Sequence, residues 1–342
     1  MSRFSRRDLI VGGATCGFGA GLRQERISAR HAAIDSGLRT TADRRGTGLR
    51  RQALTVDDPL SRLDSLLDNE SGVYGLIVVD AQGHMRYSRN ARLPFISASL
   101  YKLILATEIL RQIEGGELQW EQLVVLEEGY FPPTDNYDGA YGYDMIGAAI
   151  SIDEALWASI CVSSNIAALA LLQLTTPESM NTLSRSLGLV STNFASNLAE
   201  LDFWPPSLSA AESTDQLSMA VSLIESASLE WNVNLTSPAD MTRFTQAVLQ
   251  QTLLSEFVSS ELLRLLLAQE INDRIPALLP PGTRIAHKTG NLTSIIHDTG
   301  AIFCDEGPIL MTLMSQAVPD EYHAIRLFQS IAAMIYADFL ER

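Results

Sequence analysis

A serine and a lysine stand three residues apart in the stretch PFISASLYKL, as Ser99 and Lys102. On a helix, positions i and i+3 lie on the same face, so the amine of Lys102 can reach the hydroxyl of Ser99. The apolar neighbours would desolvate this amine, lower its pKa and let it accept the serine proton. The opposing hypothesis is a capped helix start with a lysine on its rim, because this spacing is expected about once by chance in a chain of such length.

Two further short motifs could supply polar groups to the same site. The segment Ser163–Asn165 (SSN) interrupts a long apolar run, which is costly unless its polar groups are paired or face a cleft. The segment Lys288–Gly290 (KTG) lies in an expected strand near the end of the chain, where Gly290 would let a ligand approach the backbone closely. The alternative for this lysine is a charge that protects a strand edge.

The elements that must position these motifs follow from hydrophobic periodicity. An amphipathic helix is expected from Asp57, and a strand hairpin is expected from Val73 to Ser88. Helical periodicity dominates from Ser99 to about Leu253. Strand patterns then return in TRIAHKTG, HDTGAIFCD and PILMTLMSQAV, and a last helix is expected over Asp320 to Leu340. Strands at both ends with helices between them predict one antiparallel sheet built from the two termini, an inserted helical domain, and an active site in the crevice between them.

Composition and charge narrow the function. The chain is 46% hydrophobic and has a formal net charge of -15, yet residues 1–51 carry 11 arginines and only four acidic residues. The remainder is therefore strongly acidic, and an acidic surface repels nucleic acid and anionic membranes. We expect no nucleic-acid partner.

The front of the chain has features of an export signal. The pattern SRRDL, residues 5–9, resembles a twin-arginine signal, and the 14 uncharged residues from Leu9 to Leu22 are too few to span a bilayer. We expect an exported protein with a signal over residues 1–22, a linker over 23–56 and a folded body over 57–342. The alternative for the front segment is a disordered basic tail.

Cysteine and histidine usage predicts neither a disulfide framework nor a metal site. Neither the number nor the pattern of the three cysteines demands a bridge, so we expect Cys161 and Cys304 to be buried free thiols. The five histidines are scattered singly and there is no C-x-x-C motif. We therefore expect no metal.

Taken in order, S-x-x-K, S-x-N and K-T-G resemble the active-site motifs of the class A β-lactamases and penicillin-binding proteins. The similarity extends to PFISASLYKL, SSNIAALALL, NLTSPADMTRF and PPGTRIAHKTGNLTSIIHDTGAIF, and it covers roughly Asp57 to Arg342. It implies a serine hydrolase of α/β (α+β) class with a five-stranded antiparallel sheet, flanking terminal helices and a helical subdomain inserted at about residues 99–280. It also implies acyl-enzyme chemistry of the penicilloyl type.

The resemblance assigns a catalytic role to four residues. Ser99 would be the nucleophile and Lys102 its proton acceptor or relay. Ser163 would pass a proton to the leaving nitrogen, and Lys288 would raise the local positive potential.

Substrate binding falls to the remaining motif residues. Asn165 would hold the substrate's side-chain amide, and Thr289 would bind a substrate carboxylate together with Lys288. The backbone N–H groups of Ser99 and Asn291 would form the oxyanion hole, next to Gly290. We expect no cofactor, a monomer, and a small β-lactam or a peptidoglycan-like peptide as the partner.

One departure from the family concerns deacylation. The class A enzymes carry a water-activating glutamate in a pattern like E-x-x-L-N, and alignment on LDFWPPSLSAAE puts Pro205 at the glutamate and Ser209 at the asparagine. Glu200 or Glu212 could supply a displaced carboxylate. Three hypotheses stay open: a slow β-lactamase-like hydrolase, a penicillin-binding peptidase relative, and a non-catalytic module that binds cell-wall peptide.

Overall fold

The computed structural model describes residues 59–132, 138–195 and 234–340. The chain divides into two units at Arg45 and Gly46, and every described residue belongs to the second unit. The expected export signal and linker, and the segment that contains Glu200, Pro205, Ser209 and Glu212, lie outside the described residues.

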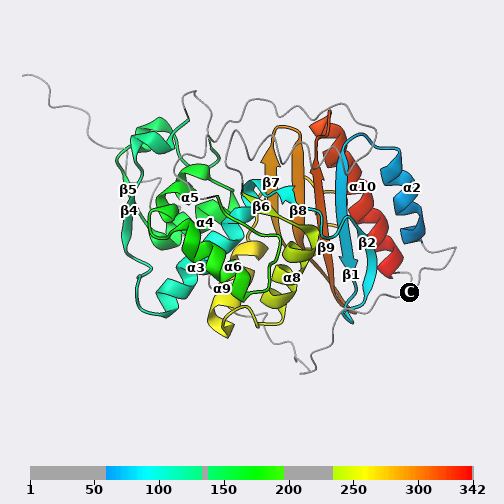
Figure 1. Cartoon of the computed structure of the whole chain (residues 1–342), viewed down its shortest axis with the longest axis horizontal. Coiled ribbons are helices and arrows are strands. Elements are labelled where there is room, and N and C mark those ends of the chain that lie inside the picture. The colour runs from blue at the N-terminus through cyan, green and yellow to red at the C-terminus, as the bar shows by residue number, and fades with distance from the viewer. Residues whose placement is uncertain (1–58, 133–137, 196–233, 341–342) are drawn as a thin grey trace, which may run out of the picture. The chain divides into compact units, whose positions relative to one another are not determined.

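A five-stranded antiparallel sheet is the largest sheet in the described part of the chain (Figure 1). Its strands, listed in spatial order, are β2 (Met85–Arg89), β1 (Val73–Val79), β9 (Gly307–Gln316), β8 (Ile295–Cys304) and β7 (Arg284–Leu292). Strand β1 pairs with β9, so the hairpin near the front of the described chain is joined to its last strand. The sheet predicted from the two ends of the sequence is confirmed.

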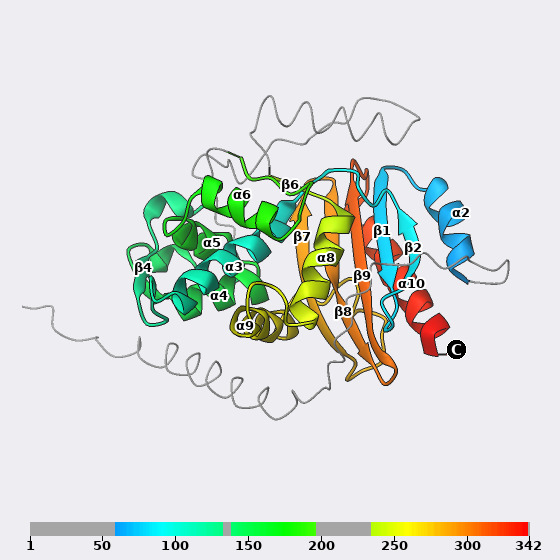
Figure 2. The same ribbon diagram turned by 60° about the horizontal axis from the view of Figure 1, so that its bottom comes forward.

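Helices cover both faces of this sheet (Figure 2). Alternate residues of β1 separate by face, because successive strand side chains point in opposite directions. Tyr74, Leu76 and Val78 pack in one buried cluster with helices α2 (Leu63–Asp68) and α10 (Glu321–Leu340). On the other face lies α8 (Pro238–Leu249), where the hydroxyls of Thr242 and Thr312 on β9 are 2.8 Å apart. Both faces of the sheet are therefore buried.

The remaining helices form a layer beside the free edge of β7. The central helix is α3 (Tyr101–Glu114), whose side chains are buried on nearly every side. Around it lie α4 (Ile152–Cys161), α5 (Asn165–Leu172), α6 (Pro177–Ser186) and α9 (Glu256–Leu267). Two small two-stranded sheets complete this part, β3 (Phe95–Ile96) with β6 (Leu235–Thr236) and β4 (Leu123–Val125) with β5 (Ala149–Ser151).

Three local expectations need correction. The helix expected from Asp57 is seen, within the described residues, as a 3₁₀ turn over Pro59–Arg62 followed by the short α2. The helical periodicity expected from Ser99 to about Leu253 is not continuous, because α4 ends just before the SSN motif and α5 begins at its last residue. Cys304 is a free thiol, but it is only half-buried because it lies at the end of β8, next to the hairpin turn.

In residues 59–132, 138–195 and 234–340, no helix combines the length and the apolar character needed to cross a bilayer.

Candidate active site

Ser99 lies in a tight turn that connects the sheet side of the molecule to α3. It is the middle residue of the 3₁₀ turn Ala98–Leu100, directly before α3, and it is half-buried. Ala98 has a left-handed φ of +45°, a conformation that costs a non-glycine residue of order 1 to 3 kcal/mol. Within the described residues the Ser99 hydroxyl makes no hydrogen bond. The candidate nucleophile thus lies on a strained turn, and its hydroxyl has no hydrogen-bond partner among the described residues.

Gly290 of the KTG motif packs against this turn. A Cβ atom at position 290 would lie 3.3 Å from the Cβ of Ala98 and 3.4 Å from the Cγ of Leu100. Glycine at this position therefore lets edge strand β7 approach the serine turn closely. The sequence predicted close approach of a ligand to the backbone at Gly290, which stays a prediction, and the close neighbour in the structure is the serine turn.

Lys102 is fully buried on α3 and has two short hydrogen bonds. Its Nζ donates to the main-chain oxygen of Ser163 at 2.6 Å and to Oδ1 of Asn165 at 2.7 Å. The hydrogen bond to Ser99 suggested by the i, i+3 spacing is not found among the described residues. The SSN turn therefore holds the amine of Lys102. A neutral amine that donates its two N–H groups to these two acceptors keeps its lone pair free to accept a proton.

Ser163 lies between two lysines. Its Oγ accepts a hydrogen bond from Nζ of Lys288 at 2.8 Å and lies 3.4 Å from Nζ of Lys102. Its φ is +60°, so this residue too is held in a left-handed conformation. Lys102 and Lys288 are the only lysines in the entire chain. The fold therefore brings the chain's two primary side-chain amines to one serine hydroxyl.

The environment favours the neutral form of both amines. Burial, and then the positive charge of Lys288, lower the pKa of Lys102 well below 10.5, whereas the carboxylate of Asp138 acts in the opposite direction. Burial, with the charge of Arg274 as the next cause, lowers the pKa of Lys288 to about 7. A buried neutral lysine next to a serine is the arrangement that allows proton transfer.

Two functional candidates were missed by the sequence reasoning. Buried Arg274 donates to Oδ1 of Asn291 at 2.5 Å and to the main-chain oxygen of His297 at 3.1 Å, which brings a guanidinium beneath the KTG strand. Asp138 accepts a 2.6 Å hydrogen bond from Ser164 in the SSN turn. Each lies in a connecting segment without a recognisable motif, so only the folded structure reveals its position.

The other predicted site residues are found along β7. Thr289 is buried and Asn291 is exposed, two residues further along the same strand. Because β7 is the sheet edge, its outward main-chain groups are not used by a sixth strand in the described part of the chain. The same part contains no group of three or more His, Cys, Asp or Glu side chains that could hold a metal ion.

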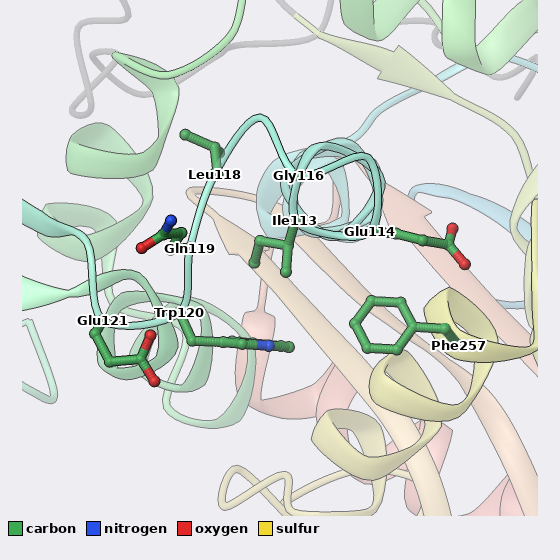
Figure 3. Close-up of a pocket in the computed structure, with 8 residues that line it drawn as sticks. All are labelled: Ile113, Glu114, Gly116, Leu118, Gln119, Trp120, Glu121 and Phe257. Carbon is green, nitrogen blue, oxygen red and sulfur yellow. The ribbon is translucent and has the colours of Figure 1, made fainter.

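A separate groove of about 600 Å³ lies near the C-terminal end of α3 (Figure 3). Trp120 and Phe257 meet edge to face there, with ring centroids 6.2 Å apart, and Glu114 and Glu121 lie on its rim. None of the motif residues lines it. The groove contributes no group to the serine and lysine cluster.

The sheet, the surrounding helices and the cluster of Ser99, Lys102, Ser163 and Lys288 are those of a β-lactamase-like serine hydrolase fold. The model of the beta-lactamase enzyme family (Beta-lactamase2) matches residues 59–339, so the chain belongs to that family. It is 25% identical to the extended-spectrum beta-lactamase PER-1 of Pseudomonas aeruginosa over 256 residues, which are 70% of this chain and 73% of PER-1.

Solved structures show the same fold. A beta-lactamase from Sphaerobacter thermophilus DSM 20745 has a TM-score of 0.69 at 20% identity, covering 82% of this chain and 95% of the other. PBP-A has a TM-score of 0.68 at 17% identity, covering 86% and 99%. A PBP-A variant, described as an acyl-enzyme complex with penicillin G, has a TM-score of 0.68 at 17% identity, covering 86% and 98%.

Proposed function

We propose that the protein is a serine hydrolase that opens β-lactams, or related amides and esters, through a covalent acyl-enzyme on Ser99. The observation that carries this proposal is the convergence of both lysines on Ser163, next to the strained turn that presents Ser99. A module that only binds peptide has no use for a nucleophile accompanied by two partly neutralised amines.

Acylation follows from these positions. Ser99 Oγ forms a bond to the substrate carbonyl carbon while its proton passes to the neutral amine of Lys102. The carbon–nitrogen bond then breaks, and the leaving nitrogen takes a proton from the Ser163 hydroxyl. Lys288 can supply a new proton to Ser163 Oγ, because its amine donates a hydrogen bond to that oxygen. Backbone N–H groups of Ser99 and Asn291 stabilise the oxyanion.

Substrate binding is assigned to the edges of the same cluster. Asn165, already turned toward Lys102 through Oδ1, holds the substrate amide. The carboxylate binds at Lys288 and Thr289, on the strand that Gly290 brings close to the nucleophile. No cofactor takes part in this scheme.

The first experiment incubates the full chain with a chromogenic cephalosporin and follows colour and intact mass together. We expect a covalent adduct that is absent in Ser99→Ala. A wild-type protein that gives neither adduct nor turnover with β-lactams and small esters would favour the peptide-binding module instead.

Deacylation is proposed to be slow, because alignment of the sequence with the class A pattern puts Pro205 at the water-activating glutamate. The acyl-enzyme should outlive that of an ordinary class A enzyme by orders of magnitude, giving a fast first turnover followed by slow hydrolysis. A long-lived acyl-enzyme is also what a penicillin-binding peptidase would form, so this feature equally supports that second candidate. Transfer of the acyl group to an added amine, rather than to water, would favour the peptidase.

A double substitution tests the missing base. Pro205→Glu combined with Ser209→Asn should speed the disappearance of the adduct, while Glu200→Gln and Glu212→Gln should change little. Fast wild-type turnover that collapses in either glutamine variant would identify a relocated base and overturn the proposal of slow deacylation.

Export by the twin-arginine route is proposed from the sequence of the first residues. Residues 1–52 fused to a reporter that must leave the cytoplasm folded should direct its export. Replacing Arg6 and Arg7 with lysine should abolish export, and unchanged export would mean that this motif is not recognised.

A further inference from the structure

Asp138 makes hydrogen bonds that tie two segments of the chain together. Its Oδ1 accepts from the backbone N–H groups of Ala140 at 3.1 Å and Tyr141 at 2.9 Å, which orders its own loop. Its Oδ2 accepts from the hydroxyl of Ser164 at 2.6 Å and the backbone N–H of Ile166 at 3.0 Å, at the start of α5. The short oxygen–oxygen distance is typical of a charge-assisted hydrogen bond.

The neighbouring residue shows how closely the two segments fit. Gly139 has a φ of +91°, and a Cβ atom there would lie 3.3 Å from the main-chain oxygen of Val162. Val162 directly precedes Ser163, so the Asp138 loop packs against the residue that leads into the SSN turn. The tight approach and the carboxylate hydrogen bonds are two independent observations of one contact.

This contact acts on the part of the site that holds Lys102. Ser164 stands between the two residues that accept hydrogen bonds from Lys102 Nζ, the main-chain oxygen of Ser163 and Oδ1 of Asn165. Ser163 keeps a left-handed φ, a conformation that persists only when its surroundings determine it. Asp138 supplies such a constraint through the hydroxyl of Ser164.

Asp138 also contributes charge. The charged groups of the described residues that act on Lys102 are Lys288 on β7, which lowers the pKa of Lys102, and Asp138, which raises it. The aromatic ring of Tyr101 on α3 itself lies 5.9 Å from Nζ. Asp138 is thus the counter-charge to Lys102, whereas Asp298 acts in the same direction on Lys288.

We propose that Asp138 is a positioning residue for acylation, which holds the SSN turn against Lys102 and supplies negative charge near the amine of Lys102. This inference rests on the proposed function, since it names a residue that supports the same serine chemistry. Asp138 does not touch the reacting atoms in this proposal and acts through Ser164 and through its charge.

The experiment compares two variants with a matched pair elsewhere in the full chain. Asp138→Asn removes the charge, and Ser164→Ala removes the hydroxyl link while the carboxylate stays. Ser255 offers the same arrangement away from the site: its Oγ caps α9 by accepting from the backbone N–H of Val258 at 3.1 Å and donates to Glu114 at 2.9 Å. Ser164 likewise caps α5, because its Oγ accepts from the backbone N–H of Ala167 at 3.0 Å, so Ser255→Ala and Glu114→Gln control for the loss of a helix cap and of a hydroxyl–carboxylate pair.

Two readouts separate positioning from general stability. We expect Asp138→Asn and Ser164→Ala to lower the pH-independent acylation rate roughly 10- to 100-fold, because small misplacements of reacting groups are costly. In Asp138→Asn the acidic limb of the rate profile should also move to lower pH, since removing the counter-charge lowers the pKa of Lys102. Ser164→Ala keeps the charge and should shift this limb less. The two control variants should acylate at the wild-type rate.

Lysine side chains labelled with ¹³C provide the second readout, which does not depend on activity. The chain has only two lysines, and Lys288→Met identifies their signals. In Asp138→Asn the titration of Lys102 should move to lower pH. An unchanged titration together with wild-type acylation would refute the role of Asp138. If wild type forms no adduct but the titration moves as expected, the proposed function fails while the charge link stands. If Asp138→Asn does not fold, wild-type acylation by Ser164→Ala refutes the positioning role.

Discussion

Replacing Lys288 with methionine should stabilise the protein in a pH-dependent way. Lys288 is fully buried, and burial together with Arg274 lowers its pKa from 10.5 to about 7. Between these two pH values the unfolded chain binds a proton that the folded protein does not. Wild-type stability therefore rises with pH across this window, and the full cost of charging Lys288 is present below pH 7.

The size of this cost follows from the pKa. One pH unit corresponds to about 1.4 kcal/mol, so a pKa that falls from 10.5 to about 7 corresponds to roughly 5 kcal/mol. The hydrogen bonds from Nζ to Ser163 Oγ and to the main-chain oxygen of Thr289 are lost in the variant and offset part of the gain. Removing Lys288 also raises the pKa of Lys102, which reduces the cost of charging that residue as well.

Urea unfolding of wild type and Lys288→Met from pH 6 to pH 10 measures this effect. The free energy of unfolding of the variant, relative to wild type, should be greatest near pH 6 and should fall steadily above pH 7. In the variant the single remaining lysine gives one ¹³C signal, whose titration should move to higher pH than in wild type. A stability difference that does not change with pH would refute the depressed pKa of Lys288 and, with it, its proposed role as a proton donor to Ser163.

Three further substitutions test the geometry of the site and sheet. Lys102→Ala should slow acylation roughly 10²- to 10⁴-fold in stopped-flow measurements, as expected for the loss of a general base, and acylation at the wild-type rate would leave this lysine a structural role only. Gly290→Ala should impair acylation because its Cβ would crowd Ala98 at 3.3 Å, and adding Ala98→Gly should restore much of the rate if this contact is the cause. Gly300→Ala would place a Cβ 2.3 Å from the main-chain oxygen of Ala286, so chemical denaturation should show a loss of about 3 kcal/mol or more, and an unaffected midpoint would contradict the tight pairing of β7 and β8.

The sheet could be predicted because its strands carry their own signals. The stretch VYGLIVV is continuous and apolar, and the structure has β1 over Val73–Val79 as predicted. The KTG lysine lies in a strand, as its neighbours indicated. That strand is at the edge of the sheet, so its position alone is also compatible with a lysine that protects a strand edge. Burial separates the two hypotheses, because Lys288 is fully buried and donates to Ser163.

The break in the apolar helix could not be predicted in the same way. Serine has no strong preference for a left-handed φ, so the sequence of Ser163 does not encode the turn that it forms. The turn is determined by tertiary contacts, including the hydrogen bond from Ser164 to a residue 26 positions earlier in the chain. Helical periodicity reports only local preference, and it continued across the motif because the flanking residues on both sides are apolar.

The placement of charge explains why the chemistry depends on so few residues. The chain has 23 arginines, 12 of them after residue 51, yet its two lysines are the basic residues found around Ser163. Arginine stays protonated at any pH a protein tolerates, whereas a buried lysine can lose its proton near neutrality. A neutral amine can accept a serine proton and a guanidinium cannot, so the proposed proton transfer from Ser99 requires lysine rather than arginine. Arg274, whose guanidinium donates to Asn291 in the strand of the KTG motif, is a fixed positive charge that lowers the pKa of Lys288, and in the proposed mechanism this favours release of the Lys288 proton.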